Sequence, residues 1–338
     1  MSNDRFNSLD GMRGLMAVAV LYSHLIGTYY GWLPDRPLVG AGFCVMYFFM
    51  LSGFVLSASH KENEGIKYFF VRFSRLFPLH FITTISMLII YAFNKKNGLY
   101  YSSDDVFNIN VIIKNILFMH GITPNNFILL NEPSWSISLE FWCSLLVPFI
   151  LMKLGIKEKL ISVPIIMVLT FNFFPENLPH NFLMASICML IGNVAYTIKS
   201  KKSVIKIAES KYFELLSVIS IAICILAIYY GSSGFESYIC LMAFCPLLLI
   251  DLTRRNFIIK RILCCRFILF LGFISFPLYL FHESIIVSDI IPRHFNFYTY
   301  STLILLTTMT VSYLYNRKIG SPLYKYCKNK IYTSGKKN

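Results

Sequence analysis

Apolar stretches of about twenty residues, each long enough to cross a bilayer as a helix, follow one another along nearly the whole chain. Short polar connections separate them. The pattern predicts helices at residues 13–32, 39–59, 76–93, 134–153, 159–174, 181–199, 212–230, 235–251, 267–287 and 300–316. The expected fold is therefore all-α: a polytopic bundle of about ten transmembrane helices.

Composition agrees with a membrane protein, since 56% of the residues are hydrophobic and only 14% are charged. A soluble core could not bury that much apolar surface. The net charge of +14 would suit a nucleic-acid partner if the basic residues formed one patch. They are instead spread over alternate connections between the predicted helices, so we expect membrane lipid as a partner and no nucleic acid.

Alternation of basic connections also predicts the topology. Most of the 31 lysines and arginines fall on one side of the predicted layout. Basic connections stay in the cytoplasm, so we expect both termini there and an even number of spans. The chain is read as one integral membrane domain over residues 1–338, embedded from about residue 8 to 317 and followed by a basic cytoplasmic tail at 318–338.

One external connection, residues 94–133, is long and contains an amphipathic stretch at 105–119. We expect a helix there. It lies on or dips into the outer surface of the membrane, or it is a plain surface helix; the pattern fits both equally.

The nine cysteines lie mostly inside apolar runs, and no pair or Cys/His cluster has the spacing of a zinc site. They are expected to pack as small hydrophobic side chains. No metal site is predicted.

The first predicted helix carries two ionisable side chains, Arg13 and His24. They stand about 16 Å apart along the axis, so Arg13 can lie at the interface while His24 lies deep in the membrane. A histidine at that depth marks a functional site or forms a hydrogen bond between helices. The helix alone does not decide between them.

Arg72 and Arg75 lie three residues apart just before the third predicted helix and share one helical face at the cytoplasmic interface. Their arrangement fits phosphate binding, or the ordinary anchoring of a helix by basic residues at the cytoplasmic membrane interface. Glu140 lies about 9 Å inside the outer end of the fourth predicted helix. There it orients a histidine or arginine, or locks two helices together.

His282 lies about 22 Å from the cytoplasmic start of the ninth predicted helix, in the same outer half of the membrane as His24 and Glu140. Ionisable side chains from three helices at one depth predict a buried site, provided that the helices meet. His80, nearer the cytoplasm, is assigned to packing or a secondary role, and the other histidines fall in connections.

Five short motifs in order extend this picture: Asp10-Gly-Met-Arg13-Gly14 with the later His24; Phe49-Met-Leu-Ser52-Gly53-Phe54; Arg72-x-x-Arg75-x-x-Pro78; Trp135-Ser136-Ile-Ser-Leu-Glu140; and Ser275-Phe-Pro-Leu-Tyr279-Leu-Phe-His282. Together they resemble the acyltransferase-three family of integral membrane O-acyltransferases, in its stand-alone form. Phe276 and Pro277 depart from the family's usual tyrosine and small residue, a change that bears on the helix bend near His282.

The resemblance implies transfer of an acyl group, usually acetyl from acetyl-CoA, to a hydroxyl of a cell-surface carbohydrate or lipid-linked glycan such as O-antigen, capsule or exopolysaccharide. The enzyme is then a multi-pass protein of the bacterial inner (plasma) membrane. His24, Glu140 and His282 are its expected catalytic residues. His24 serves as general base or as transient acyl carrier, and both roles stay open here.

The acyl-CoA donor is cytoplasmic and polyanionic, so Arg13, Arg72 and Arg75 are its expected contacts. No metal is needed for this chemistry.

A proton-coupled transporter or flippase of a small anionic or lipid-linked substrate is the alternative function, with the buried histidines and Glu140 as its proton relay. Broken helices and inverted repeats would favour it, and the sequence has neither clearly. A purely structural scaffold has no use for the ionisable groups.

Overall fold

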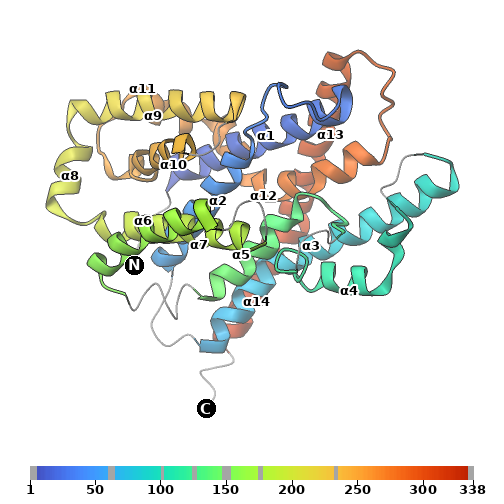
Figure 1. Cartoon of the computed structure of the whole chain (residues 1–338), viewed down its shortest axis with the longest axis horizontal. Coiled ribbons are helices and arrows are strands. Elements are labelled where there is room, and N and C mark those ends of the chain that lie inside the picture. Colours follow the sequence, from blue (N-terminus) through green and yellow to red (C-terminus); the bar gives the residue numbers. More distant parts are fainter. Residues whose placement is uncertain are drawn as a thin grey trace. The chain divides into compact units, whose positions relative to one another are not determined.

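The computed structural model describes residues 6–59, 65–99, 103–123, 128–146, 154–173, 178–231 and 235–333 (Figure 1). Helix accounts for 81% of these residues, and none of them forms a strand. The prediction of an all-α protein is therefore confirmed.

Each predicted apolar stretch corresponds to a helix. The ten helices are α1 (Asn7–Tyr30), α2 (Gly42–Ser59), α3 (Gly65–Lys96), α5 (Ser134–Leu146), α6 (Ile156–Phe173), α7 (Leu178–Ile198), α9 (Lys211–Tyr230), α10 (Phe235–Leu248), α12 (Arg266–Val287) and α13 (Phe297–Tyr315). The expected fourth helix extended to residue 153, but residues 147–153 lie outside the described part.

Five of the described helices are long and apolar enough to cross a membrane: Gly42–Ser59, Ile66–Lys96, Asn181–Ile198, Lys211–Tyr230 and Arg266–Val287. The chain is thus an integral membrane protein built of apolar helices. The count of ten spans and the cytoplasmic position of both termini stay predictions.

Shorter helices connect the long ones: η1 (Asp104–Phe107), α4 (Ile109–Ile116), α8 (Lys202–Ala208), η3 (Ile250–Leu252), α11 (Ile258–Leu263), η4 (Asn316–Gly320) and α14 (Ser321–Thr333). The helix expected in residues 105–119 is confirmed as α4, which begins where the Asn108 side chain accepts a hydrogen bond from the Asn110 amide. Part of the expected basic tail is α14.

Two compact units divide the chain, and each is described by itself. The first comprises residues 1–60 and 146–275, and the second comprises 61–145 and 276–338. Helix α12 belongs to both, because the division falls between Ser275 and Phe276. It runs as one helix from Arg266 to Val287, through Pro277.

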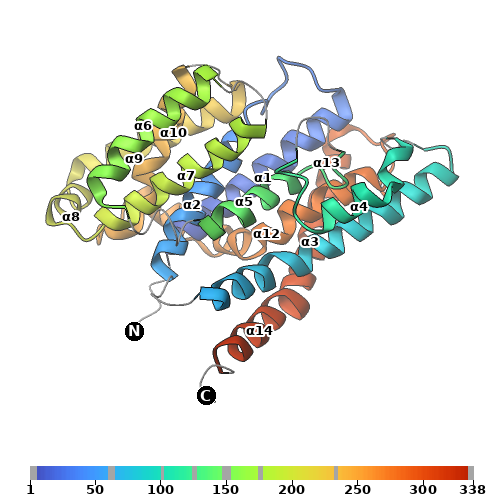
Figure 2. The ribbon, with the colours of Figure 1, turned by 60° about the horizontal axis from the view of Figure 1, so that its bottom comes forward.

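The first unit is organised by the close packing of α2 on α7 (Figure 2). A β-carbon added to Gly53 would lie 2.0 Å from the Met189 carbonyl oxygen, and one added to Gly192 would lie 1.9 Å from that of Met50. The two helices therefore approach through backbone, as small residues permit in membrane proteins. Asn193 reinforces the contact, donating to the Ser57 hydroxyl at 2.7 Å.

At the other side of the first unit, α1 is fixed at its start by Asp251 of η3. The Asp251 carboxylate accepts hydrogen bonds from the amides of Ser8 at 3.0 Å and Leu9 at 3.4 Å. These amides are among the first of the helix and have no acceptor within it. An acidic side chain here also suits the positive end of the helix dipole.

The second unit is arranged along α3, its longest described helix. Near one end of α3 the Tyr68 hydroxyl donates to the Ser144 carbonyl of α5 at 2.9 Å. Near the other end the Asn94 side chain donates to the Val287 carbonyl of α12 at 3.1 Å. Polar side chains of α3 therefore bind two neighbouring helices, each through a backbone carbonyl.

The cysteines do not form disulfides within the described residues. Cys44, Cys143, Cys188 and Cys224 are buried as expected, whereas Cys265 is exposed. Cys240 lies outside the residues whose side chains are described.

The backbone contact between α2 and α7 predicts the effect of adding one methyl group. We expect Gly53→Ala to lower the free energy of unfolding by about 1–3 kcal/mol, because the new β-carbon must push Met189 away. Thermal unfolding of the purified protein in detergent measures the change. Gly42→Ala is the matched control, since no atom lies within 4 Å of its added β-carbon. Equal melting temperatures for both variants would contradict the close contact.

Candidate active site

Arg13 is held in place by partners on two helices of the first unit. Its Nε donates to the Ser275 hydroxyl at 2.8 Å and its Nη2 donates to the Gly272 carbonyl at 3.0 Å, both on α12. The same guanidinium forms an ion pair with Asp10, one turn earlier, at 3.1 Å. The side chain is nevertheless 27% exposed. The Arg13 guanidinium is thus a positive charge that is held in place and still partly accessible to a ligand.

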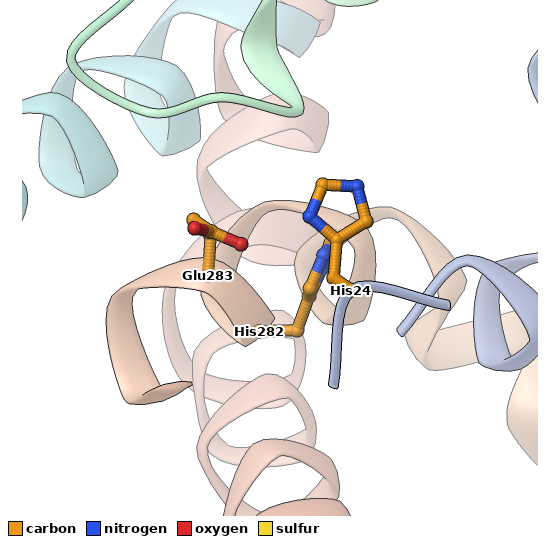
Figure 3. Close-up of side chains that lie close together, drawn as sticks. All are labelled: His24, His282 and Glu283. Atoms are coloured by element: carbon orange, nitrogen blue, oxygen red, sulfur yellow. The ribbon is translucent and has the colours of Figure 1, made fainter. Parts of the chain in front are cut away.

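His24 lies near the end of α1 and is half-buried. Its ring meets the Trp32 indole edge-on, with the ring centroids 5.5 Å apart. The chain turns back at Gly31, whose φ of +99° suits glycine, and Trp32 packs over Gly27, where an added β-carbon would lie 2.7 Å from the indole. The turn after α1 therefore folds an aromatic wall against the histidine (His24 is drawn in Figure 3).

A cation lies on this aromatic wall. The Arg36 guanidinium is 4.3 Å from the centroid of Trp32, and it donates to the Ser23 carbonyl at 2.7 Å. Arg36 lies in the connection between the first two predicted helices. Its role could not be found from spacing, because it depends on the reversal of the chain at Gly31.

In the second unit, Arg72 pairs with Glu140. The Arg72 Nη2 atom is 2.8 Å from Glu140 Oε1, and its Nε donates to the Ser144 hydroxyl at 3.2 Å. The two side chains are 5% and 15% exposed. The prediction that Arg72 lies at one face of the membrane and Glu140 in the opposite half is therefore wrong. Of the roles left open for Glu140, orienting an arginine and locking two helices both agree with this pair.

Arg75 follows Arg72 by one turn of α3 but is exposed. The two arginines of the motif thus stand in different surroundings, although the sequence gives them one helical face. Phenylalanines line α3 beside them, with Phe73 stacked on Phe77 at 4.4 Å.

His282 is fully buried on α12, and the next residue, Glu283, is 8% exposed (Figure 3). The His282 Nδ1 atom is 3.3 Å from the Leu278 carbonyl, which can only accept, so a hydrogen bond between them requires a proton on Nδ1. Glu283 was missed by sequence reasoning. Its signal was present, since a carboxylate beside a histidine in an apolar helix is itself unusual.

A tyrosine connects α5 with the His282 segment. The Tyr279 hydroxyl is 2.8 Å from the Ser136 hydroxyl and donates to the Pro133 carbonyl at 3.2 Å. Glu140 lies one turn after Ser136, and His282 lies about one turn after Tyr279. The second unit therefore fixes the helical segments that carry these two residues against each other.

Two further histidines, His80 and His120, stack in the second unit with ring centroids 5.4 Å apart. Their Nε2 atoms lie 2.7 Å from the Asn115 carbonyl and 3.0 Å from the Ser134 carbonyl. Burial lowers the pKa of His120, which lies outside the five candidate spans, from its ordinary value of 6.5. This ring is neutral at neutral pH and joins the connection after α4 to the start of α5.

The predicted meeting of His24 with Glu140 and His282 joins residues of the two units, so it stays a prediction. Within the units, Arg13 and His24 share α1, while Arg72, Arg75, Glu140 and His282 belong to the second unit.

Comparison of the sequence with known proteins identifies a family. The family model described as "Acyltransferase domain", of the acyltransferase-three family, matches residues 6–317. No solved structure matches.

Two curated relatives each match 40% of the chain. Acyltransferase MdmB from Streptomyces mycarofaciens is 29% identical over 149 residues, and Protein 2 in picA locus from Rhizobium radiobacter is 29% identical over 153 residues. The matched parts cover 37% and 78% of those two proteins. The match with MdmB therefore spans little more than a third of that relative.

The family model, unlike the relatives, covers nearly the whole chain, including every motif that carries a candidate site residue. It favours the enzyme over the transporter that the buried ionisable groups left open. The chain belongs to the acyltransferase-three family, whose model is described as an acyltransferase domain.

Proposed function

We propose that this acyltransferase transfers an acetyl group from acetyl-CoA to a hydroxyl of a cell-surface carbohydrate or lipid-linked glycan, such as O-antigen, capsule or exopolysaccharide, at the bacterial inner membrane. Membership of the family supports the part of the proposal that concerns acyl transfer. The choice of donor and acceptor rests on the arrangement of charged groups and on the family resemblance.

The observation that carries the proposal is the presence of Arg13 and His24 on one face of α1. Eleven residues rotate the helix by only about 20° beyond whole turns and advance it by about 16 Å. The continuous helix therefore holds a fixed guanidinium and a half-buried imidazole in line. A donor bound by phosphate at the Arg13 end extends its thioester toward His24.

His24 acts as general base in this proposal. Its imidazole takes the proton of the acceptor hydroxyl as the oxygen attacks the thioester carbonyl. The carbon–sulfur bond breaks, and the leaving coenzyme A thiolate takes the proton from the imidazolium. In the alternative, His24 first accepts the acetyl group and then passes it to the acceptor. Both routes need a neutral histidine that the acyl group can reach.

Arg75 and Arg13 contact the donor phosphates in this proposal, because their guanidinium groups keep accessible surface. Arg72 supports them as a positioning residue. Its guanidinium is committed to Glu140 and Ser144, so it fixes α3 against α5 and with it the position of Arg75. Glu140 orients Arg72 through this pair in the proposal, and His282 is assigned as a second group that accepts a proton.

Replacing His24 tests the proposed reaction. We expect His24→Ala to lower kcat/KM for acetyl transfer by about 10²–10⁴-fold, because the general base is lost. The melting temperature should not change, because the substitution removes little packing. Surface glycan from cells with the variant would lack the acetyl mass that mass spectrometry finds with the wild type. His294→Ala, an exposed histidine in a connection, is the matched control.

Radiolabelled acetyl-CoA offered without acceptor separates the two roles of His24. Label on the wild-type protein that is absent from His24→Ala supports the acyl carrier, and transfer without labelled protein supports the base. Near-normal transfer by His24→Ala would refute both roles.

Replacing Arg75 tests donor binding. We expect Arg75→Gln to raise KM for acetyl-CoA about tenfold with little change in kcat, because one charge-assisted hydrogen bond to phosphate is worth about 1.5–3 kcal/mol. Steady-state kinetics over a range of acetyl-CoA concentrations gives both constants. Lys325→Gln removes an exposed charge on α14 and serves as the control. An unchanged KM for Arg75→Gln would remove this contact.

The buried pair gives a separate test of Arg72. Glu140→Leu leaves a guanidinium buried without its carboxylate and should cost about 3–5 kcal/mol of stability. The double variant Arg72→Met with Glu140→Leu should recover most of that loss in thermal unfolding. If Arg72 only positions Arg75, the double variant keeps KM for acetyl-CoA within a few-fold of the wild type. A large rise in KM would instead assign Arg72 to the donor phosphates.

A further inference from the structure

An apolar cavity of about 390 Å³ lies in the first unit between α1, α9 and α11. A volume of this size is within the range of small-molecule sites, about 300–1,000 Å³. Its walls contain no charged residue. The cavity therefore suits a hydrocarbon group and does not suit a charged group.

The cavity opens to the surface of the protein. Ile225 of α9 and Ile262 of α11 line it and are 60% and 53% exposed. Helix α9 is one of the candidate spans, and its exposed apolar side chains suit contact with lipid. Along α9 the lining runs from Ile221 to Tyr229, about 12 Å, which approaches the about 15 Å of one leaflet's hydrocarbon. One lipid chain can therefore enter from the membrane and lie along the helix.

The segment at one end of the cavity is strongly basic. Helix α11 contributes Ile259, Ile262 and Leu263 to the lining. The same segment carries five basic residues, and no acidic residue occurs between Asp251 and Glu283. They are Arg254, Arg255, Lys260, Arg261 and Arg266.

The arginines of this segment are exposed, whereas the Lys260 amine donates to the Thr253 carbonyl. The acidic residue in contact with the segment is Glu209, which accepts from the Arg254 amide. Basic side chains beside an apolar pocket between membrane helices attract anionic lipid headgroups. The charge thus complements a phosphate group at the end of the cavity.

The direction of the cavity separates it from the acyl-transfer site. Met12, Leu15, Met16 and Ala19 of α1 line it and lie within about 100° of one another around the helix. Arg13 and His24 point about 120° away from the mean direction of these four residues. A chain in the cavity is therefore held on a different face of α1 from His24, which argues against the acyl group of the donor as its occupant.

We propose that this cavity binds one acyl chain of an anionic phospholipid, with the lipid phosphate held by exposed arginines of the basic segment, which carries Arg254, Arg255, Arg261 and Arg266. The lipid stays bound as a structural partner of α1, α9 and α11 and is not acylated. It packs against a different side of α1 from the reacting groups and so supports the helix that carries them.

Lipid retention by the full-length protein tests the site. The purified, delipidated protein is exposed to vesicles of equal parts phosphatidylglycerol and phosphatidylcholine, and the bound lipids are identified by native mass spectrometry. We expect one retained phosphatidylglycerol. Arg261→Gln with Arg266→Gln should reduce the preference for phosphatidylglycerol about tenfold, since each basic residue near a lipid surface contributes to binding anionic lipid. Lys318→Gln with Lys325→Gln, which removes the same charge from exposed positions near the carboxyl end, should leave it unchanged.

A second variant tests binding of the acyl chain in the cavity independently of charge. Ile225→Phe partly fills the opening of the cavity, and because position 225 is exposed, the larger side chain does not disturb the folding of the protein. It should lower retention of both lipids. Equal retention of the two lipids by the wild type would overturn the proposal, as would an unchanged preference after the double arginine change. Displacement of the lipid by glycerol 3-phosphate would assign the site to a free phosphate, and displacement by octanoyl-CoA would assign it to the donor; either result refutes the proposal.

Discussion

Buried polar groups in this protein must find hydrogen-bond partners inside the helical units, because the apolar surroundings of the helices do not supply water as a partner. An unpaired polar group in such surroundings is costly. Arg13 meets this constraint with partners on α12, and Arg72 meets it with Glu140 and Ser144. The Asn131 side chain does so through the Leu280 carbonyl at 3.1 Å. These contacts decide which helical faces turn inward, a choice that uniformly apolar surfaces leave open.

Fixing a charge through such contacts has a chemical consequence. Arg13 cannot swing toward a ligand, since its guanidinium is held by Ser275 and Gly272 and its neighbour Asp10 offsets part of the charge. A positive group that is already oriented stabilises an incoming anion without the cost of reorganising itself. The other face of α1 is entirely apolar where it lines the cavity. One helix thus combines a preorganised polar side with a side that only lipid or protein can cover.

The positions of the long helices could be predicted from the sequence, because hydrophobic length is a local property. Each of the ten apolar stretches contains a helix within the described residues, and the amphipathic stretch at 105–119 contains α4. Contacts between helices could not be predicted in this way. Arg72 and Glu140 were assigned to opposite halves of the membrane on depth alone, yet their side chains form an ion pair. Depth counted along an ideal span takes no account of the reach of an arginine side chain. The stacking of His80 on His120 could not be predicted for a related reason, because it brings together residues distant in sequence.

The Arg72-x-x-Arg75 motif shows why a shared helical face does not imply a shared role. A spacing of three residues separates two side chains by only about 60° around the helix, which favours a joint grip on one ligand. In the structure, one arginine is 5% exposed and paired with a carboxylate, and the other faces solvent or lipid. Removing the buried arginine leaves Glu140 without its partner in apolar surroundings, so the protein loses stability before any ligand is considered. Loss of activity in such a variant is therefore no measure of phosphate binding, and only a change that removes both members of the pair isolates what Arg72 contributes to the donor.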